Sequence, residues 1–172
     1  MVIGSAPADL HAMKWAEIPV PGDFCDAPGL VHFDDIGESR ANSRTRGQVH
    51  LHRGDGPVYG DLDGDGEDEA ALTVSCNNGS DTGAGDLIEG SVVFTRLGGQ
   101  LISIGTLTPQ HNPPEAGNCT RIGKVELTPQ RITVEELWYR QTDSTCCPTG
   151  KATTVWTREG DRLVPGPPRI TS

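Results

Sequence analysis

The chain has 172 residues, a length that suits one domain with a single core. Only 34% of the residues are hydrophobic and 5% aromatic, whereas glycine occurs 22 times and proline 13 times, so short strands joined by many turns are favoured over long helices. The 14 Lys and Arg face 24 Asp and Glu, and this net charge of -10, without a local basic patch, argues against nucleic acid and anionic membranes as partners.

The N-terminal part of the chain is expected to be irregular. Residues 1–8 are predicted as a flexible lead. Asp9 is a candidate N-cap for one short helix that reaches Trp15, and the prolines and glycines around Cys25 predict turns. Residues 37–47 have no apolar periodicity and are predicted as an exposed loop.

Regular alternation of apolar and polar residues begins at Val49. Val49 and Leu51 share one face of a predicted strand. Residues 70–76 alternate in the same way and predict a second, half-buried strand. The acidic residues 61–69 therefore lie between two strands, with no helix-forming segment on either side.

Three hairpins are predicted in the second half of the chain. Gly98-Gly99 supplies the two positive φ angles of a tight primed turn, and the other two hairpins turn around Pro129-Gln130 and Gly160-Asp161. The six strands are expected at residues 91–97, 101–107, 122–127, 131–139, 152–158 and 162–164. The sequence thus predicts a mainly β fold, an antiparallel sandwich- or barrel-like sheet with one short N-terminal helix, and α+β is the alternative. Residues 9–168 form the expected single domain, and residues 169–172 a tail.

The strongest chemical signal is the acidic loop, residues 61–69, with the sequence Asp-Leu-Asp-Gly-Asp-Gly-Glu-Asp-Glu. Six of the 24 acidic residues lie in it without a basic one, so its carboxylates repel one another unless a cation relieves them. Ca²⁺ takes roughly six to eight oxygen ligands, which a short loop supplies when carboxylates recur at alternate positions and glycines permit a tight wrap. We expect a Ca²⁺ site here; the alternative is an Asp/Gly-rich surface turn without a metal.

The spacing also assigns the ligands. The expected set is Asp61, Asp63, Asp65 and Glu69 through their side chains and Glu67 through its backbone carbonyl oxygen. Leu72 occupies the twelfth position, where an EF-hand requires a bidentate glutamate, so the loop is not an EF-hand.

The D-x-D-x-D-G-x-x-E pattern resembles the Ca²⁺ loops of FG-GAP/VCBS-type repeats and of dockerins, and the strand on each side favours the first comparison. The resemblance implies the same five ligands and leaves Asp68 without a role. The pattern occurs once in the chain, whereas a propeller needs several copies. A loop that continues directly into a core strand favours an ion that stabilises the fold rather than one that signals.

Five cysteines in a chain with few large apolar residues favour an exported protein, because small exported domains often reinforce a modest core with disulfides. We expect Cys25 to pair with Cys76, and Cys119 with Cys146 or Cys147, since adjacent cysteines in an extended chain point to opposite faces. The alternative is a cytosolic protein with reduced, buried cysteines. Zinc is not supported, because no C-x-x-C motif or neighbouring histidine occurs.

The expected location is secreted or in the cell envelope, with a signal sequence that this chain does not contain. Residues 1–8 lack the basic and apolar regions of a signal peptide. No run of residues approaches the roughly 18 apolar positions of a membrane-spanning helix.

The remaining candidates for a site are weaker. His50 and His52 share the polar face of their strand and could chelate a transition metal, although surface histidines without a third ligand are commoner. The acidic pairs at 34–35 and 135–136 are interpreted as solvated positions, and the aromatic pair at 138–139 as core or edge packing. No known catalytic motif is present, so no catalytic residue and no organic cofactor are assigned.

A second resemblance covers about thirty residues of the C-terminal third. Residues 143–150, Asp-Ser-Thr-Cys-Cys-Pro-Thr-Gly, with Thr154-Val155-Trp156 and residues 160–164, are similar to the tail of the LppP/LprE-like group of actinobacterial exported proteins and lipoproteins. The group implies no reaction for this chain. The cysteine of a lipobox is not present near the start of this sequence.

The sequence thus predicts an exported, Ca²⁺-binding, non-enzymatic module of the cell envelope that binds an extracellular protein or a glycan or has a structural role. A secreted protease inhibitor is the first alternative, because disulfides and Pro/Gly-rich loops rigidify such proteins. A Ca²⁺-dependent hydrolase is the second.

Overall fold

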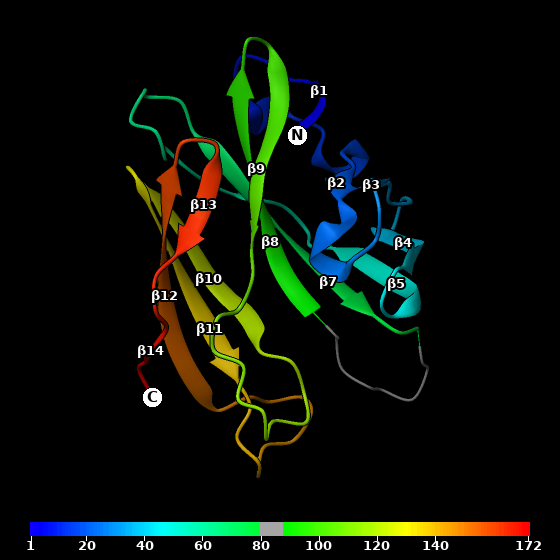
Figure 1. Ribbon diagram of the computed structural model, residues 1–172. Coiled ribbons are helices and arrows are strands. Elements are labelled where there is room, and N and C mark those ends of the chain that lie inside the picture. The colour runs from blue at the N-terminus through cyan, green and yellow to red at the C-terminus, as the bar shows by residue number, and fades with distance from the viewer. Residues whose placement is uncertain (80–87) are drawn as a thin grey trace.

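The computed structural model describes residues 1–79 and 88–172, which form two large antiparallel sheets and one small one (Figure 1). The first sheet has the order β1-β9-β8-β7-β5-β4, with β6 also paired to β7. Its strands are β1 (Val2–Ser5), β4 (Glu38–Ser43), β5 (Gly47–Arg53), β6 (Val58–Gly60), β7 (Glu69–Asn77), β8 (Ile88–Leu97) and β9 (Gln100–Leu107).

The second sheet has the order β10-β11-β12-β13, with β14 also paired to β12. Its strands are β10 (Arg121–Thr128), β11 (Arg131–Trp138), β12 (Gly150–Glu159), β13 (Arg162–Pro165) and β14 (Arg169–Ile170). The small sheet pairs β2 (Val20–Pro21) with β3 (Leu30–Val31), and three short 3-10 turns are η1 (Leu10–Ala12), η2 (Trp15–Glu17) and η3 (Gly22–Cys25).

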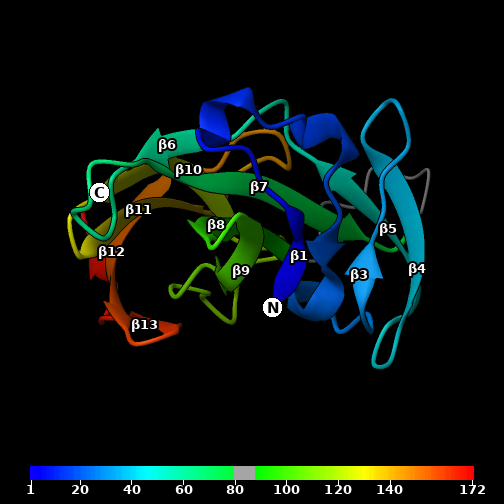
Figure 2. The same ribbon diagram turned by 90° about the horizontal axis from the view of Figure 1, so that it is seen from above.

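The first sheet lies between two hydrophobic cores. The N-terminal segment packs on one face of this sheet, and the second sheet packs on the other (Figures 1 and 2). Strand β7 contributes to both cores, because Leu72 and Val74 belong to the first core and Ala71 to the second. Successive side chains of a strand point to opposite faces, which explains how one strand serves both cores. The described part of the chain is mainly β, as the sequence predicted.

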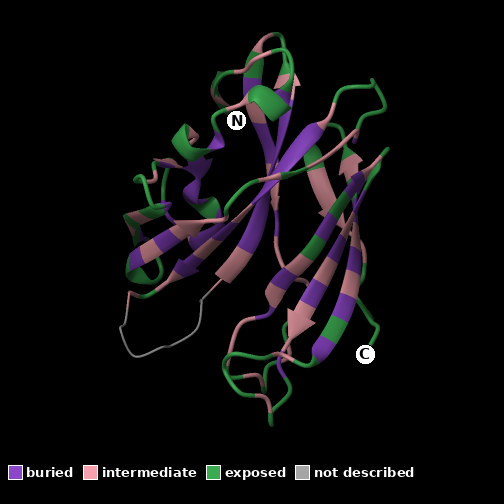
Figure 3. Cartoon of the chain, turned by 180° about the vertical axis from the view of Figure 1, so that it is seen from behind, coloured by how far each residue is buried: buried purple, intermediate pink, exposed green. Residues whose placement is uncertain are grey.

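The three predicted hairpins are confirmed. Strands β8 and β9 turn at Gly98 and Gly99, whose φ angles are 58° and 76°, so that Leu97 lies opposite Gln100. Strands β10 and β11 pair around Gln130, where φ is 65°, and β12 and β13 also pair. Figure 3 shows buried positions alternating with more exposed ones along the strands of the second sheet.

The predicted N-terminal helix is wrong: the described residues of this segment form only the 3-10 turns η1 and η2. Asp9 does cap the first turn, since its carboxylate accepts a hydrogen bond from the His11 amide at 2.9 Å. Met13 is then extended and ends the turn. A segment this short has little intrinsic helicity, and the buried side chains of Leu10 and Trp15 fix its path by packing.

Strand β4 contradicts the exposed loop predicted for residues 37–47. It pairs with β5 in regular register, from Glu38 opposite His52 to Ser43 opposite Gly47. As the last strand of the sheet, β4 exposes half of its residues and buries only Ser43, so polar residues are favoured and no apolar periodicity marks it.

Both chain ends also lie in strands. Residues 2–5, expected in a flexible lead, form β1, with Ser5 opposite Gln100 in β9. In the expected tail, Arg169 and Ile170 form β14 and pair with Thr153 and Ala152 of β12. Strands this short contain too few residues to show a periodicity. Pairing with a longer neighbouring strand positions them.

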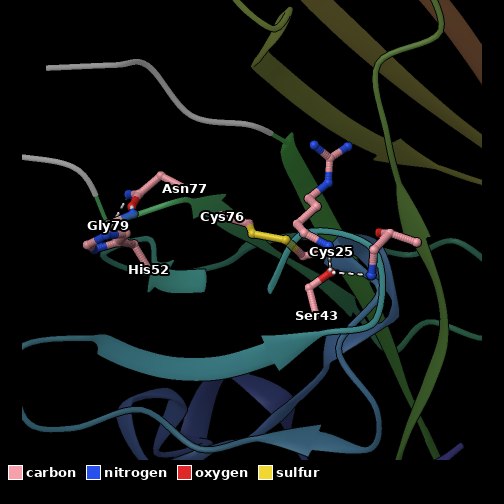
Figure 4. The surroundings of a disulfide bond; sticks show 8 residues. Cys25, Ser43, His52, Cys76, Asn77 and Gly79 are labelled. Atoms are coloured by element: carbon pink, nitrogen blue, oxygen red, sulfur yellow. Dashed lines mark hydrogen bonds between the residues drawn. A yellow bond between two sulfur atoms is a disulfide. The ribbon is translucent and has the colours of Figure 1, made fainter. Parts of the chain in front are cut away.

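One predicted disulfide is confirmed and the other is wrong. Cys25 of η3 is bonded to Cys76 of β7, and both residues are fully buried (Figure 4). Cys146 is bonded to its neighbour Cys147 instead of to Cys119, which lies outside both disulfides. The expectation assumed an extended chain at residues 146–147, whereas these residues lie in a turn closed by a hydrogen bond from the Cys147 amide to the Ser144 carbonyl. Of the described helical segments, none has the length and apolar character needed to cross a bilayer.

Candidate metal centre

The acidic loop connects β6 to β7, two strands that pair directly with each other. Gly60, just before the loop, lies opposite Glu69 at its end. Leu62 inserts its side chain into the second core with 1% of its surface exposed. The Leu62 carbonyl accepts a hydrogen bond from the Gln130 amide at 2.7 Å. The loop is therefore anchored to both sheets.

The structure brings together three of the four predicted side-chain ligands. Asp61, Asp63 and Asp65 each offer a carboxylate oxygen, and these three atoms lie within 4.8 Å of one another. Among the residues that the structure describes, this is the one place where three or more candidate ligand groups converge so closely. Three carboxylates form a hard oxygen donor set, which suits Ca²⁺ or Mg²⁺.

Backbone amides hold this group of carboxylates in place. The Asp61 carboxylate accepts hydrogen bonds from Gly64 at 2.7 Å and from Gly66 at 2.9 Å. The two glycines have φ angles of 79° and 86°, a conformation that side-chain-bearing residues rarely adopt. Asp63 accepts from the Asp65 amide at 3.2 Å, and Asp65 from the Glu67 amide at 2.8 Å. The glycines thus allow the chain to wrap around the carboxylates.

Glu69 is placed apart from the three aspartates. It is buried, with 3% of its surface exposed, and its carboxylate points back into the protein. It accepts hydrogen bonds from the Leu62 amide at 2.7 Å, the Asp63 amide at 3.4 Å and the Thr95 hydroxyl at 3.2 Å. Its side chain therefore holds the start of the loop, while Glu67 is exposed to solvent.

The electrostatics of the loop favour a cation. Partial removal from water, the side-chain hydrogen bond with Asp65 and the negative charges of Asp65 and Asp61 raise the pKa of Asp63 above its ordinary value, against the opposing effect of the hydrogen bond from the Asp65 amide. Burial likewise raises the pKa of Glu69, against the opposing effect of its hydrogen bonds and with a smaller contribution from the charge of Asp63. A bound cation would relieve the charge repulsion that contributes to the raised pKa of Asp63.

Asp68, which has no role in the spacing pattern, connects the loop to the N-terminal segment. Its carboxylate lies 2.8 Å from Nε2 of His11, whose ring stacks on Tyr59 at 3.8 Å between centroids. The Tyr59 hydroxyl accepts a hydrogen bond from the Trp15 indole at 2.9 Å. Sequence reasoning missed this contact because Asp68 and His11 are 57 positions apart and belong to no shared motif. A cavity of about 360 Å³ lies between η1 and the end of the loop, with Arg96 in its wall.

His50 and His52, a weaker candidate for a metal site, lie on the same strand, β5. His52 lies 3.7 Å from the Glu38 carboxylate, and its Nε2 lies 3.1 Å from the Asn77 amide nitrogen (Figure 4). His50 and His52 do not converge with a third ligand group among the described residues. We assign no metal to this pair.

Glu136 was interpreted as solvated and is fully buried, so this interpretation was wrong. Its carboxylate accepts hydrogen bonds from the amides of Gln110 and His111 at 2.7 and 2.8 Å and from the hydroxyl of Thr154. Two adjacent acidic residues in a strand face opposite sides, and one of those sides here meets the backbone of the β9–β10 connection. Glu136 thus anchors that connection.

No protein-family model, curated protein or solved structure matches the chain. The resemblances to FG-GAP/VCBS-type loops and to the LppP/LprE-like group therefore stay predictions that rest on the residues quoted for them.

Proposed function

We propose that the protein is an exported, non-enzymatic binding or structural module of the cell envelope, in which Ca²⁺ stabilises the acidic loop. The observation that carries this proposal is the convergence of Asp61, Asp63 and Asp65, whose carboxylate oxygens lie within 4.8 Å of one another. The calcium would be held by these three side chains and by the backbone carbonyl oxygen of Glu67. Water molecules would complete the coordination, because the three aspartates lie at the surface.

Because the Glu69 carboxylate points into the protein, we do not include it among the proposed ligands. The carboxylate that the spacing assigned to the metal accepts the Leu62 and Asp63 amides instead. Glu69 therefore supports Asp63 through the backbone and does not contact the ion. A site with three carboxylates keeps enough negative charge to bind a divalent cation.

A stabilising role is favoured over a signalling one. Strands β6 and β7 are paired at both ends of the loop, and Leu62 and Gln130 connect it to the second sheet. Ca²⁺ sensors, in contrast, work by changing the angle of a helix pair. Binding an ion to a loop with fixed ends adds its binding free energy to the free energy of unfolding.

The proposed location agrees with the disulfides. Two cysteine pairs lie at bonding distance, and disulfides persist mainly in oxidising compartments. An extracellular protein or a glycan is the proposed partner.

The test is thermal unfolding in Ca²⁺ and in EGTA. Ca²⁺ at about 100 times its dissociation constant should stabilise the protein by about 2.7 kcal/mol and raise the melting temperature by several degrees. Asp63→Ala should abolish this rise. Asp55→Ala, which removes an exposed carboxylate outside the loop, should keep it. An identical melting temperature of the parent protein in Ca²⁺ and in EGTA contradicts the proposal.

A further inference from the structure

The two disulfides differ sharply in their access to solvent. Cys25 and Cys76 are each 0% exposed and lie in the first core. Cys146 and Cys147 are both exposed, in the connection between β11 and β12 at one end of the second sheet. A thiolate must reach a sulfur atom along the S–S bond to cleave it, so only the second disulfide is open to attack in the folded protein.

The connection that carries Cys146 and Cys147 has a base that does not depend on their disulfide. The Asp143 carboxylate accepts hydrogen bonds from the amides of Arg140 and Thr149, both at 2.8 Å, and from the Thr149 hydroxyl at 2.8 Å. The Tyr139 hydroxyl donates to the Thr145 carbonyl at 2.8 Å. These contacts close the connection on both sides of the cysteines. Cleavage of the disulfide should therefore leave the ends of β11 and β12 in place.

The two sulfur atoms have different surroundings. The Ser144 hydroxyl oxygen lies 3.1 Å from Sγ of Cys146. A disulfide sulfur has no hydrogen, so the hydroxyl is the donor in this contact. The same hydrogen bond is stronger when Sγ becomes a thiolate, because charged acceptors form stronger hydrogen bonds. Ser144 therefore favours Cys146 as the sulfur that leaves.

We propose that Cys146–Cys147 is a thiol–disulfide exchange site for a dithiol reductant, such as a protein with two neighbouring reactive cysteines. The reductant thiolate attacks Sγ of Cys147, a mixed disulfide forms, and Cys146 leaves as a thiolate that takes up a proton. The second thiol of the reductant loses its proton and attacks the reductant sulfur of the mixed disulfide, which releases Cys147 as a thiolate that is then protonated. The protein gains two electrons and two protons, and the reductant becomes a disulfide.

The exchange would act locally. It opens the ring formed by two consecutive residues and changes a compact, apolar disulfide into two polar thiols at the surface. The buried Cys25–Cys76 bond keeps the N-terminal segment attached to β7 throughout. The site is independent of the proposed Ca²⁺ loop, because it lies in the β11–β12 connection and shares no residue with it.

The test measures reduction of the folded protein by limiting dithiothreitol, followed by rapid alkylation and mass mapping of each cysteine. Cys146 and Cys147 should become alkylated at least about tenfold faster than Cys25 and Cys76. Near-ultraviolet circular dichroism before and after the first step should show the tertiary structure retained. Simultaneous reduction of both disulfides, or a Cys146–Cys147 bond that stays oxidised until the protein unfolds, overturns the proposal.

A pair of variants tests the part played by Ser144. Ser144→Ala should slow the reduction of Cys146–Cys147 about threefold or more, because the leaving thiolate loses a hydrogen bond. Thr142→Ala removes an exposed hydroxyl from the same connection and should leave the rate unchanged. Equal rates for the two variants would overturn the assignment of Cys146 as the leaving sulfur.

Discussion

At the scale of single residues, the Glu69 side chain of the acidic loop has different neighbours from those that its spacing predicts. The spacing assigned Glu69 to the metal, yet its carboxylate accepts hydrogen bonds from the Leu62 amide and the Thr95 hydroxyl. The spacing gives the positions of the carboxylates in the sequence but not the directions in which their side chains point. The direction of Glu69 is set by the pairing of β7 with β6 and β8, which places its side chain beside Thr95, and no local pattern contains that partner.

Glu69→Ala therefore tests a structural role against a ligand role. The substitution leaves the buried Leu62 amide and Thr95 hydroxyl without this acceptor, so it should lower the free energy of unfolding by about 2 kcal/mol or more. We expect this loss in EGTA as well as in Ca²⁺, as measured by urea denaturation. Glu67→Ala, at an exposed position of the same loop, should cost less than about 0.5 kcal/mol in EGTA. A loss that occurs only in Ca²⁺ would instead make Glu69 a ligand.

Asp143 gives a prediction with a defined pH dependence. Hydrogen bonds from the Arg140 backbone, and then those from Thr149, hold the pKa of this carboxyl below its ordinary value of 3.8. Because the folded-state pKa is lowered, the ionised carboxylate stabilises the connection above pH 3.8, and the stabilisation disappears as the pH falls through the folded-state pKa.

The measurement is hydrogen exchange and chemical shift of the Arg140 and Thr149 amides by NMR. Both amides should stay protected at neutral pH and lose protection only in the range below pH 3.8. In Asp143→Asn the protection of these amides should be reduced at every pH, because the neutral side chain is a weaker acceptor and does not titrate. If the protection of these amides in the parent protein declines well above pH 3.8, the ionised Asp143 carboxylate is not what holds them.

At the scale of elements, the sequence predicted β5, β7 and the hairpin strands β8 to β13 and missed the strands at the two edges of the first sheet. Alternation identified β7, and the two glycines at 98–99 identified the β8–β9 hairpin, because both signals are local. Strands β1 and β4 have no such signal. Each is ordered by pairing with one neighbour, β9 or β5, and leaves at least half of its residues exposed. The same limit hid the buried position of Glu136, whose partners come from the β9–β10 connection and β12.

Gly60 of strand β6 allows a test of how closely the two sheets pack. A Cβ atom added at Gly60 would lie 2.2 Å from the carbonyl oxygen of Leu127 and 2.8 Å from its Cβ, so β6 approaches β10 as closely as glycine allows. Gly60→Ala should force the backbones apart and lower the free energy of unfolding by about 1 to 3 kcal/mol. The shift should also weaken Ca²⁺ binding, since the acidic loop begins at the next residue.

The matched control is Gly56→Ala, in the connection between β5 and β6. A Cβ atom there meets nothing within 4 Å. Its melting temperature and its affinity for Ca²⁺, measured by isothermal titration calorimetry, should equal those of the parent protein. If Gly60→Ala is as stable as Gly56→Ala, the two sheets do not pack as tightly at this point as the structure indicates.

At the scale of the whole molecule, the first sheet is the central layer, and each of its neighbours is joined to it by a hydrophobic core and by specific bonds. The N-terminal segment lacks long regular elements and is attached to β7 by the Cys25–Cys76 bond and by packing in the first core. The second sheet is joined through the second core and the Leu62–Gln130 hydrogen bond. The sequence indicated the first disulfide correctly, but the pairing of Cys146 with Cys147 depends on a turn that no apolar pattern records.

The layered arrangement predicts unequal effects of removing the two disulfides. The Cys25–Cys76 bond spans 51 positions, so its loss should release enough chain entropy in the unfolded state to destabilise the protein by about 4 kcal/mol. The Cys146–Cys147 bond spans one position and restricts almost no additional chain, so its loss should cost less than about 1 kcal/mol. The comparison is between the double variants Cys25→Ala/Cys76→Ala and Cys146→Ala/Cys147→Ala, by urea denaturation in EGTA. Both should keep the far-ultraviolet circular dichroism of the parent if they fold. A larger loss from the second pair would mean that the exposed disulfide holds the second sheet together, which its surface position and the Asp143 contacts argue against.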